Sequence, residues 1–262
     1  MHNSKKSSNF APDLQTRVMT HKLVSYLSVF LVLLLTDCSG RGTESSASDV
    51  EQYGVRIDTT TDLLIYHPTY RHVDLECEVM PSMDDSAIIF CAEAAFTGRL
   101  LDEFEHANIM GPHVSGGVRY YGYDYDQNYG LFAATDSTWC FASLPNEALI
   151  DSIAAQGGMA FTQYWVIRDS LIYKPLLQKA ETEHIYRVLA DMDGELVIVE
   201  SRNTVPYGFF TECLHVLPIR NALYMDMGSG WNHSFYRDEE ASLHVIHPRT
   251  HDYCTNWITF YK

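Results

Sequence analysis

One stretch, residues 207–238, constrains the fold more than any other part of the sequence. It begins as a short amphipathic helix that Thr211 can cap and Pro218 ends. The apolar residues of this helix recur at helical spacing, at Phe210, Leu214 and Leu217. A buried strand over 222–225 is predicted next, because the run is short and apolar.

An acid and a turn of small residues follow that strand. Asp226 stands at its exit, and Gly228, Ser229 and Gly230 come next. Glycines at such a place let the backbone turn sharply and bring several N–H groups close to one ligand. An acid beside a turn of this kind indicates a functional site.

The remaining sequence reads mainly as strands. Apolar or alternating runs predict strands at 63–67, 72–79 and 87–92. Two β-hairpins are also expected, because pairs of such runs flank short polar turns. The runs are 185–190 and 195–200 around Asp191-Met192-Asp193-Gly194, and 161–167 and 171–173 around Arg168-Asp169-Ser170.

Two further helices complete the expected fold. One has Ser143 as its cap, Pro145 in its first turn and Gly157 as its stop, with Leu149, Ile150 and Ile153 on its inner face. Another is predicted over 100–107. We therefore expect a single α+β domain, with a strand-rich mixed sheet packed against two or three helices.

The N-terminal residues resemble an export signal. An apolar run over 23–35 follows Lys22 and is shorter than the roughly 20 residues that span a bilayer. Cys38 comes just after it, which predicts a bacterial lipoprotein acylated on this cysteine, with Met19 as a candidate true start. The alternatives are an uncleaved anchor or a plain secretory signal. We expect residues 1–38 to be the signal, 39–54 a polar tether and 55–262 the domain, displayed in the cell envelope on the periplasmic or outer face.

Charge and cysteine content narrow the function further. The formal net charge of −16 becomes −18 once residues 1–38 are removed, because they hold four basic and two acidic residues. A surface this acidic argues against nucleic acid as a partner. Five cysteines remain in the domain, without a C-x-x-C pair, which leaves free buried thiols or one or two disulfides as open alternatives. The five are Cys77, Cys91, Cys140, Cys213 and Cys254.

Five tyrosines occupy the stretch 116–129 among glycines and acids. A tyrosine carries a flat apolar ring and a hydroxyl group, which suits the face of a sugar. Because tyrosine is also a good strand former, an ordinary exposed strand or loop is the favoured explanation of the stretch.

Four separated segments together resemble the phosphodiester glycosidase family. The first is 89–96, where Glu93 stands at an asparagine position and two alanines replace glycines. The second is the glycine-rich 157–163. The third is the strand and hairpin 186–194, with Arg187 in it. The fourth is Gly208 with 221–226, whose Asp226 matches the family's aspartate, although residues 227–230 replace a glycine triplet and serine.

The resemblance implies hydrolysis of a glycosyl-1-phosphate diester to a free sugar and a phosphomonoester. Glu93 and Asp226 are then the catalytic carboxyl groups. Arg187 would hold the phosphate, since arginine donates several hydrogen bonds from one fixed plane. Further substrate-binding candidates are Gln163, Gly228, Ser229, Gly230 and Asn232.

Each assignment has a structural alternative. Glu93 and Arg187 can form a salt bridge without any catalytic part, Asp226 can simply form the turn, and Arg187 can lie on an exposed hairpin face. A non-catalytic glycan-binding lipoprotein on the same scaffold is the rival function. No cofactor is required by either interpretation, and a divalent cation remains open.

A histidine pattern near the C-terminus carries less weight. His244, His247 and His251 have spacings that suit metal ligands, but Pro248 prevents a shared helical face. We therefore expect no metal site there.

Overall fold

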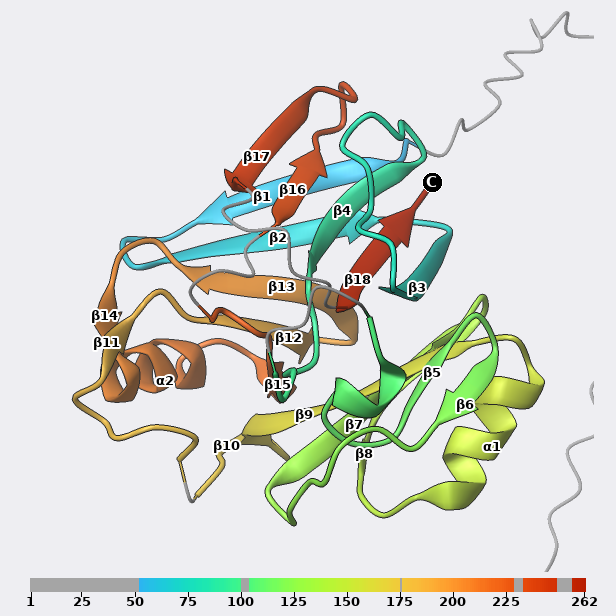
Figure 1. Ribbon diagram of the computed structural model, residues 1–262. Coiled ribbons are helices and arrows are strands. Elements are labelled where there is room, and N and C mark those ends of the chain that lie inside the picture. Colours follow the sequence, from blue (N-terminus) through green and yellow to red (C-terminus); the bar gives the residue numbers. More distant parts are fainter. Residues whose placement is uncertain (1–51, 100–103, 175, 229–232, 249–255) are drawn as a thin grey trace, which may run out of the picture. The chain divides into compact units, whose positions relative to one another are not determined.

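The computed structural model describes residues 52–99, 104–174, 176–228, 233–248 and 256–262, all within one unit of the chain, Asp49–Lys262 (Figure 1). The predicted export signal with Cys38, and residues 39–51 of the predicted tether, lie outside the described residues. Within this described part, no helix is long and apolar enough to span a membrane.

Eleven strands of the described part form the larger of the sheets. Eight of them are neighbours in the order β1 (Gly54–Thr59), β2 (Leu63–Thr69), β13 (Glu195–Ser201), β12 (Arg187–Met192), β15 (Ile219–Tyr224), β9 (Met159–Arg168), β5 (His113–Ser115) and β6 (Val118–Tyr120). The others attach to the β9 side and are β7 (Tyr129–Thr135), β8 (Thr138–Ser143) and β10 (Leu171–Ile172).

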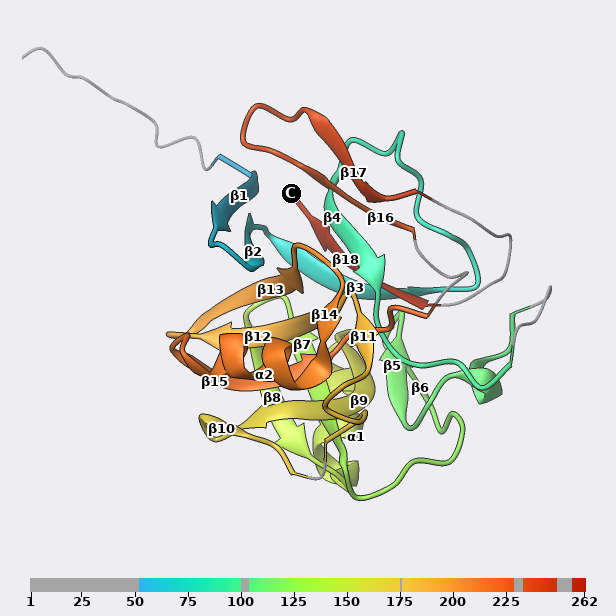
Figure 2. The ribbon, with the colours of Figure 1, turned by 90° about the vertical axis from the view of Figure 1, so that its left-hand side faces the viewer.

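A second sheet holds the segment that carries Glu93. Its strands follow the order β17 (Leu243–His247), β16 (Ser234–Arg237), β4 (Ile88–Glu93), β18 (Asn256–Tyr261) and β3 (His72–Cys77) (Figure 2). Two short strands, β11 (Glu183–His184) and β14 (Val205–Pro206), pair by themselves. The α+β class is confirmed, but the strand ladders of the described residues are antiparallel, whereas a mixed sheet was predicted.

The alternation of side chains along the strands builds the layers. On β9, Phe161 and Trp165 join a core that also contains Phe90 and Phe260 of the second sheet. Val166 points to the opposite face, where a second core gathers the inner side of α2 (Tyr207–His215). The larger sheet therefore lies between the second sheet and α2 because successive residues of a strand face opposite sides.

The first helix, α1 (Glu147–Ala155), packs Ile150 and Ile153 against β5, β7 and β9. Its cap is Asn146, whose side chain accepts a hydrogen bond from the backbone N–H of Leu149 at 3.3 Å. The predicted cap, Ser143, is wrong because β8 extends through that residue. Gly157 follows the helix with φ +70°, a conformation that favours glycine, and the predicted stop is confirmed.

The second helix, α2, begins after Pro206, four residues before its predicted cap. Thr211 lies inside the helix, where its hydroxyl donates to the carbonyl oxygen of Gly208 at 2.9 Å, so the capping prediction is wrong. The predicted inner residues Phe210 and Leu214 are buried, which confirms the helical periodicity.

The helix predicted over 100–107 is not present in its described part. Residues 100–103 lie outside the description, Phe104 and Glu105 are not helical, and a short 3-10 helix covers His106–Asn108.

Both predicted hairpins are confirmed. The β12–β13 turn consists of Asp193 and Gly194, with φ of 52° and 84°, and Asp191 accepts a hydrogen bond from the N–H of Gly194 at 3.1 Å. A two-residue turn sets the register of the strands that it joins, here Met192 opposite Glu195. The same register places Arg187 opposite Glu200.

We predict that Phe210→Ala destabilises the protein by about 3–5 kcal/mol, because a fully buried ring would leave a cavity between α2 and the larger sheet. The neighbouring Phe209 is 41% exposed, and Phe209→Ala should cost less than about 1 kcal/mol. Urea unfolding followed by circular dichroism measures both changes. Equal effects of the two substitutions would contradict this packing of α2.

Candidate active site

Three strand ends meet at one edge of the two sheets. Arg187 begins β12 and Asp226 follows β15, and these antiparallel neighbours place both residues at the same end. Glu93 ends β4 in the second sheet. Its successor Ala94 joins the sheets, because the carbonyl oxygen of Ala94 accepts a hydrogen bond from the N–H of Asp226 at 3.1 Å.

Arg187 is fully buried and already has strong partners. Its Nε and Nη2 lie 2.6 and 2.5 Å from one carboxylate oxygen of Glu200, directly across the β12–β13 hairpin. The Nη2 also donates to the Ser234 hydroxyl at 3.0 Å. The sequence analysis also considered that Arg187 could lie on an exposed face of its hairpin. This alternative is wrong, because the second sheet covers the face of the hairpin that carries Arg187.

Glu93 is the second partner of this guanidinium group. Its Oε2 lies 3.9 Å from Arg187 Nη1, and its Oε1 accepts a hydrogen bond from the backbone N–H of His233. Neither Oε2 nor Nη1 has a hydrogen-bond partner among the described residues. Glu93 and Arg187 therefore form the ion pair that the sequence analysis considered as an alternative. Their contact is long, and it leaves Oε2 of Glu93 and Nη1 of Arg187 without a hydrogen bond to the described residues.

The pKa values of the three buried acids shift in different directions, although burial raises each of them. Burial raises the pKa of Glu93 to about 7, against the attraction of Arg187 and with a smaller repulsion from Asp226. It likewise raises the pKa of Asp226 to about 6, opposed by the N–H of Gly228. Burial also acts on Glu200, but Arg187 and His247 outweigh it and hold the pKa of Glu200 below its usual range.

The remaining predicted site residues are placed as follows. Gln163 is buried beside the site, where its Nε2 donates to Ala94 at 3.1 Å and its Oε1 accepts from the N–H of Tyr164 at 2.8 Å. The side-chain amide of Gln163 is therefore used on both sides by hydrogen bonds to the backbone of Ala94 and Tyr164. Gly228 donates its N–H to Asp226 at 2.9 Å, as a turn former would require. Ser229, Gly230 and Asn232 lie outside the described residues.

The sequence reasoning missed three residues that surround Arg187. Glu200 and Ser234 contact it, and His247 Nε2 lies 3.1 Å from the second oxygen of Glu200. Glu200 could have been found, because the two-residue turn predicts its place opposite Arg187. Ser234 and His247 belong to the second sheet, and no local pattern in the sequence links them to the hairpin.

The other sequence candidates have ordinary structural contacts. His244 pairs with Asp238 at 2.7 Å, His247 pairs with Glu200, and His251 lies outside the described residues. The described residues contain no group of three or more His, Cys, Asp or Glu that could hold a metal ion. The described cysteines, which leave out Cys38 and Cys254, are free thiols.

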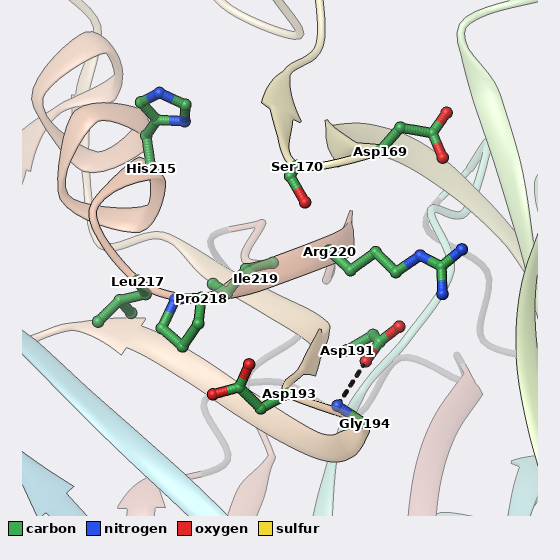
Figure 3. A pocket seen from close by; sticks show the side chains of 10 residues that line it. All are labelled: Asp169, Ser170, Asp191, Asp193, Gly194, His215, Leu217, Pro218, Ile219 and Arg220. Atoms are coloured by element: carbon green, nitrogen blue, oxygen red, sulfur yellow. Dashed lines mark hydrogen bonds between the residues drawn. The ribbon is translucent and has the colours of Figure 1, made fainter.

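A large hollow of about 760 Å³ lies at the opposite end of β12 and β15 (Figure 3). Asp169, Asp191, Asp193, His215 and Arg220 line it. Since Arg187 begins β12 and Asp191 lies near its end, this hollow is separate from the Glu93–Arg187 site.

Known proteins were compared with this chain at the levels of sequence and structure. No family model and no curated protein sequence matches it. A similar solved structure is the catalytic domain of zebrafish N-acetylglucosamine-1-phosphodiester alpha-N-acetylglucosaminidase, auto-inhibited by its pro-peptide. The TM-score is 0.56 at 13% identity, covering 83% of this chain and 85% of that one. A hypothetical protein from Synechocystis gives a TM-score of 0.42 at 11% identity, over 79% of this chain and 61% of that one.

The first of these likenesses defines the class of fold. The described part has a fold similar to that of the glycosidase catalytic domain, which agrees with the family resemblance read from the four sequence segments. At 13% identity the likeness shows the fold alone.

We predict that the protein loses stability as the pH rises from about 4.5 to 7. The pKa of Glu93 is higher in the folded protein than in the unfolded chain, so the folded state binds the proton of this carboxyl group more tightly. The free energy of unfolding is therefore highest at low pH and decreases between about pH 4.5 and 7, where the unfolded chain loses this proton first. The loss is on the order of 3 kcal/mol. Urea unfolding at several pH values measures it.

The matched variants for this prediction are Glu93→Gln and Glu212→Gln. Glu93→Gln should flatten the dependence between about pH 6 and 7, because the amide does not ionise, while the loss that Asp226 causes through its own raised pKa of about 6 falls mainly below pH 6. Glu212 is exposed on α2, and its substitution should leave the profile of the wild type unchanged. A steep profile that persists in Glu93→Gln would assign the effect to other groups.

Proposed function

We propose that this protein hydrolyses a glycosyl-1-phosphate diester, releasing a free sugar and a phosphomonoester. The observation that carries the proposal is the buried Glu93–Arg187 pair, which keeps an acid and a cationic donor partly unengaged at 3.9 Å from one another. Acids with raised pKa values beside a specific charge partner are typical of functional sites. The fold similarity to a phosphodiester glycosidase catalytic domain supports the choice of substrate class.

The proposed chemistry uses the two acids in different roles. Glu93, with its pKa near neutrality, donates a proton to the phosphate oxygen that leaves the anomeric carbon. Asp226, with the lower pKa, accepts a proton from the attacking water. The new bond joins the water oxygen to the anomeric carbon, and the electron pair of the broken C–O bond stays on the phosphate oxygen.

Arg187 is the proposed phosphate contact through its Nη1, since Glu200 and Ser234 already engage its Nε and Nη2. A fixed guanidinium group needs no rearrangement to stabilise charge on the leaving phosphate. Ser229, Gly230 and Asn232 remain proposed substrate contacts, whereas the N–H of Gly228 is engaged by Asp226. Gln163 supports the turn at Ala94 in this proposal, as its contacts favour.

A non-catalytic glycan-binding protein is the second candidate. One observation favours it: Glu93 and Arg187 have no exposed surface, and Arg187 is neutralised by Glu200 as a structural ion pair would be. In this case the tyrosines at 120–125 would supply the contact with sugar. Of these, Tyr121 and Tyr123 are 78% and 52% exposed.

The hydrolysis prediction is tested with a panel of sugar-1-phosphate methyl diesters. We expect the purified protein to release reducing sugar and methyl phosphate in equal amounts. Glu93→Gln and Asp226→Asn should each lower kcat by roughly 100-fold or more, the usual contribution of a general acid or base. Glu212→Gln serves as the control.

Turnover that is unchanged in both active-site variants would refute the assigned roles. Saturable binding of the sugar part without turnover would favour the glycan-binding candidate.

We also propose that the protein is exported and anchored in a bacterial cell envelope by a lipid on Cys38. The apolar run 23–35 followed by this cysteine supports the proposal. Labelled palmitate should be incorporated into the full chain in bacteria, and Cys38→Ser should abolish the label and release the protein from the membrane fraction. Incorporation that persists in Cys38→Ser would contradict the anchor.

A further inference from the structure

Two buried polar atoms of the site face each other without a hydrogen-bond partner among the described residues. They are Oε2 of Glu93 and Nη1 of Arg187, 3.9 Å apart. This separation is too long for a direct hydrogen bond, yet a single oxygen atom can lie within hydrogen-bonding distance of both. Because buried polar groups are nearly always satisfied, the gap indicates a bound oxygen atom.

The contacts of Arg187 with the described residues leave Nη1 as the part of the guanidinium group that is available to a ligand. Glu200 engages Nε and Nη2 from β13, and Ser234 engages Nη2 from β16. Both partners belong to strands, so the plane of the guanidinium group is fixed from two sheets. A ligand can therefore accept a hydrogen bond from Nη1. It cannot form the bidentate pair of hydrogen bonds that an unpaired arginine offers, because Nε and Nη2 are already engaged.

The charges around Glu93 decide which oxygen can enter. If Glu93, Glu200 and Asp226 are all ionised, Arg187 cannot balance them, and an additional anion at the gap would be repelled. Among the described residues, further titratable groups near the acid or its arginine are the thiol of Cys91 on β4, Tyr66 on β2, Tyr224 on β15, His233 with its backbone N–H, and His247 behind Glu200 on β17.

We propose that the gap is a subsite for one oxygen atom of an anionic phosphodiester, which enters only together with a proton on Glu93. The choice of a phosphodiester as the anion rests on the proposed function. In this state Oε2–H of Glu93 and Nη1–H of Arg187 both donate to the same oxygen. With Glu93 ionised, a water molecule takes the place, donating to Oε2 and accepting from Nη1.

The raised pKa of Glu93 agrees with this arrangement. Burial brings that pKa to about 7, so the proton is available near neutral pH without a large cost. Anion binding would raise the pKa further, because a proton and an anion that bind to the same gap assist each other.

Dimethyl phosphate is a suitable probe, since it is a monoanionic phosphodiester with no proton to lose between pH 6 and 9. Its binding to the full chain is measured by isothermal titration calorimetry, in buffers of different ionisation enthalpy. We expect the wild-type affinity to fall about tenfold per pH unit above about 7, with uptake approaching one proton per site.

The variant Glu93→Gln makes the test specific. Its amide donates permanently, so the affinity should become independent of pH and stay close to the low-pH affinity of the wild type. Glu76→Gln is the matched control, because Glu76 lies on β3 of the same sheet, where it accepts from the hydroxyl of Tyr261. This control should keep the pH profile of the wild type.

Absence of binding, or binding of the wild type that is independent of pH and takes up no proton, would overturn the subsite. A folded Glu93→Gln variant that no longer binds would do so as well. These outcomes are separate from the proposed function. Diester turnover with pH-independent binding overturns only the subsite, whereas proton-coupled binding without turnover of the diester panel supports the subsite and overturns the hydrolase.

Discussion

The burial of one guanidinium group shapes the centre of this structure. Arg187 has no exposed surface, and a buried charge is tolerated only when it is paired and hydrogen-bonded. Glu200 on the neighbouring strand provides the main pairing, and Ser234 of the second sheet adds a neutral partner. Glu93 completes the set from β4. Two sheets are thus held together at one edge by contacts to a single side chain.

Two carboxyl groups share this arginine but differ in their protonation. Glu200 makes close contacts of 2.5 and 2.6 Å and also contacts His247, so its ionised form is favoured. Glu93 stands at 3.9 Å, and burial dominates its pKa. Glu200 therefore neutralises the arginine, while Glu93 remains able to hold a proton near neutral pH.

Much of the fold could be predicted, because hairpins and short helices depend on residues that are close in sequence. The turn at Asp193 and Gly194 defines the register of β12 with β13, and the spacing of Phe210 and Leu214 defines the inner face of α2. The caps were wrong where neighbouring elements extended further than their local signals suggested. Thr211 is interior to α2, and Ser143 belongs to β8.

The sequence by itself determined the α+β class, the presence of the two hairpins and the choice of Glu93, Arg187 and Asp226 as site candidates. Only the tertiary structure decided that Arg187 is buried, that Ser234 and His247 surround the ion pair, and that Gln163 supports the turn at Ala94. The physical reason for this division is that the first group of features depends on residues close in sequence and the second on contacts between distant strands. Secondary structure follows from local spacing, whereas the environment of a charge depends on strands as far apart in sequence as those of Glu93 and Arg187, which meet when the second sheet packs on the first.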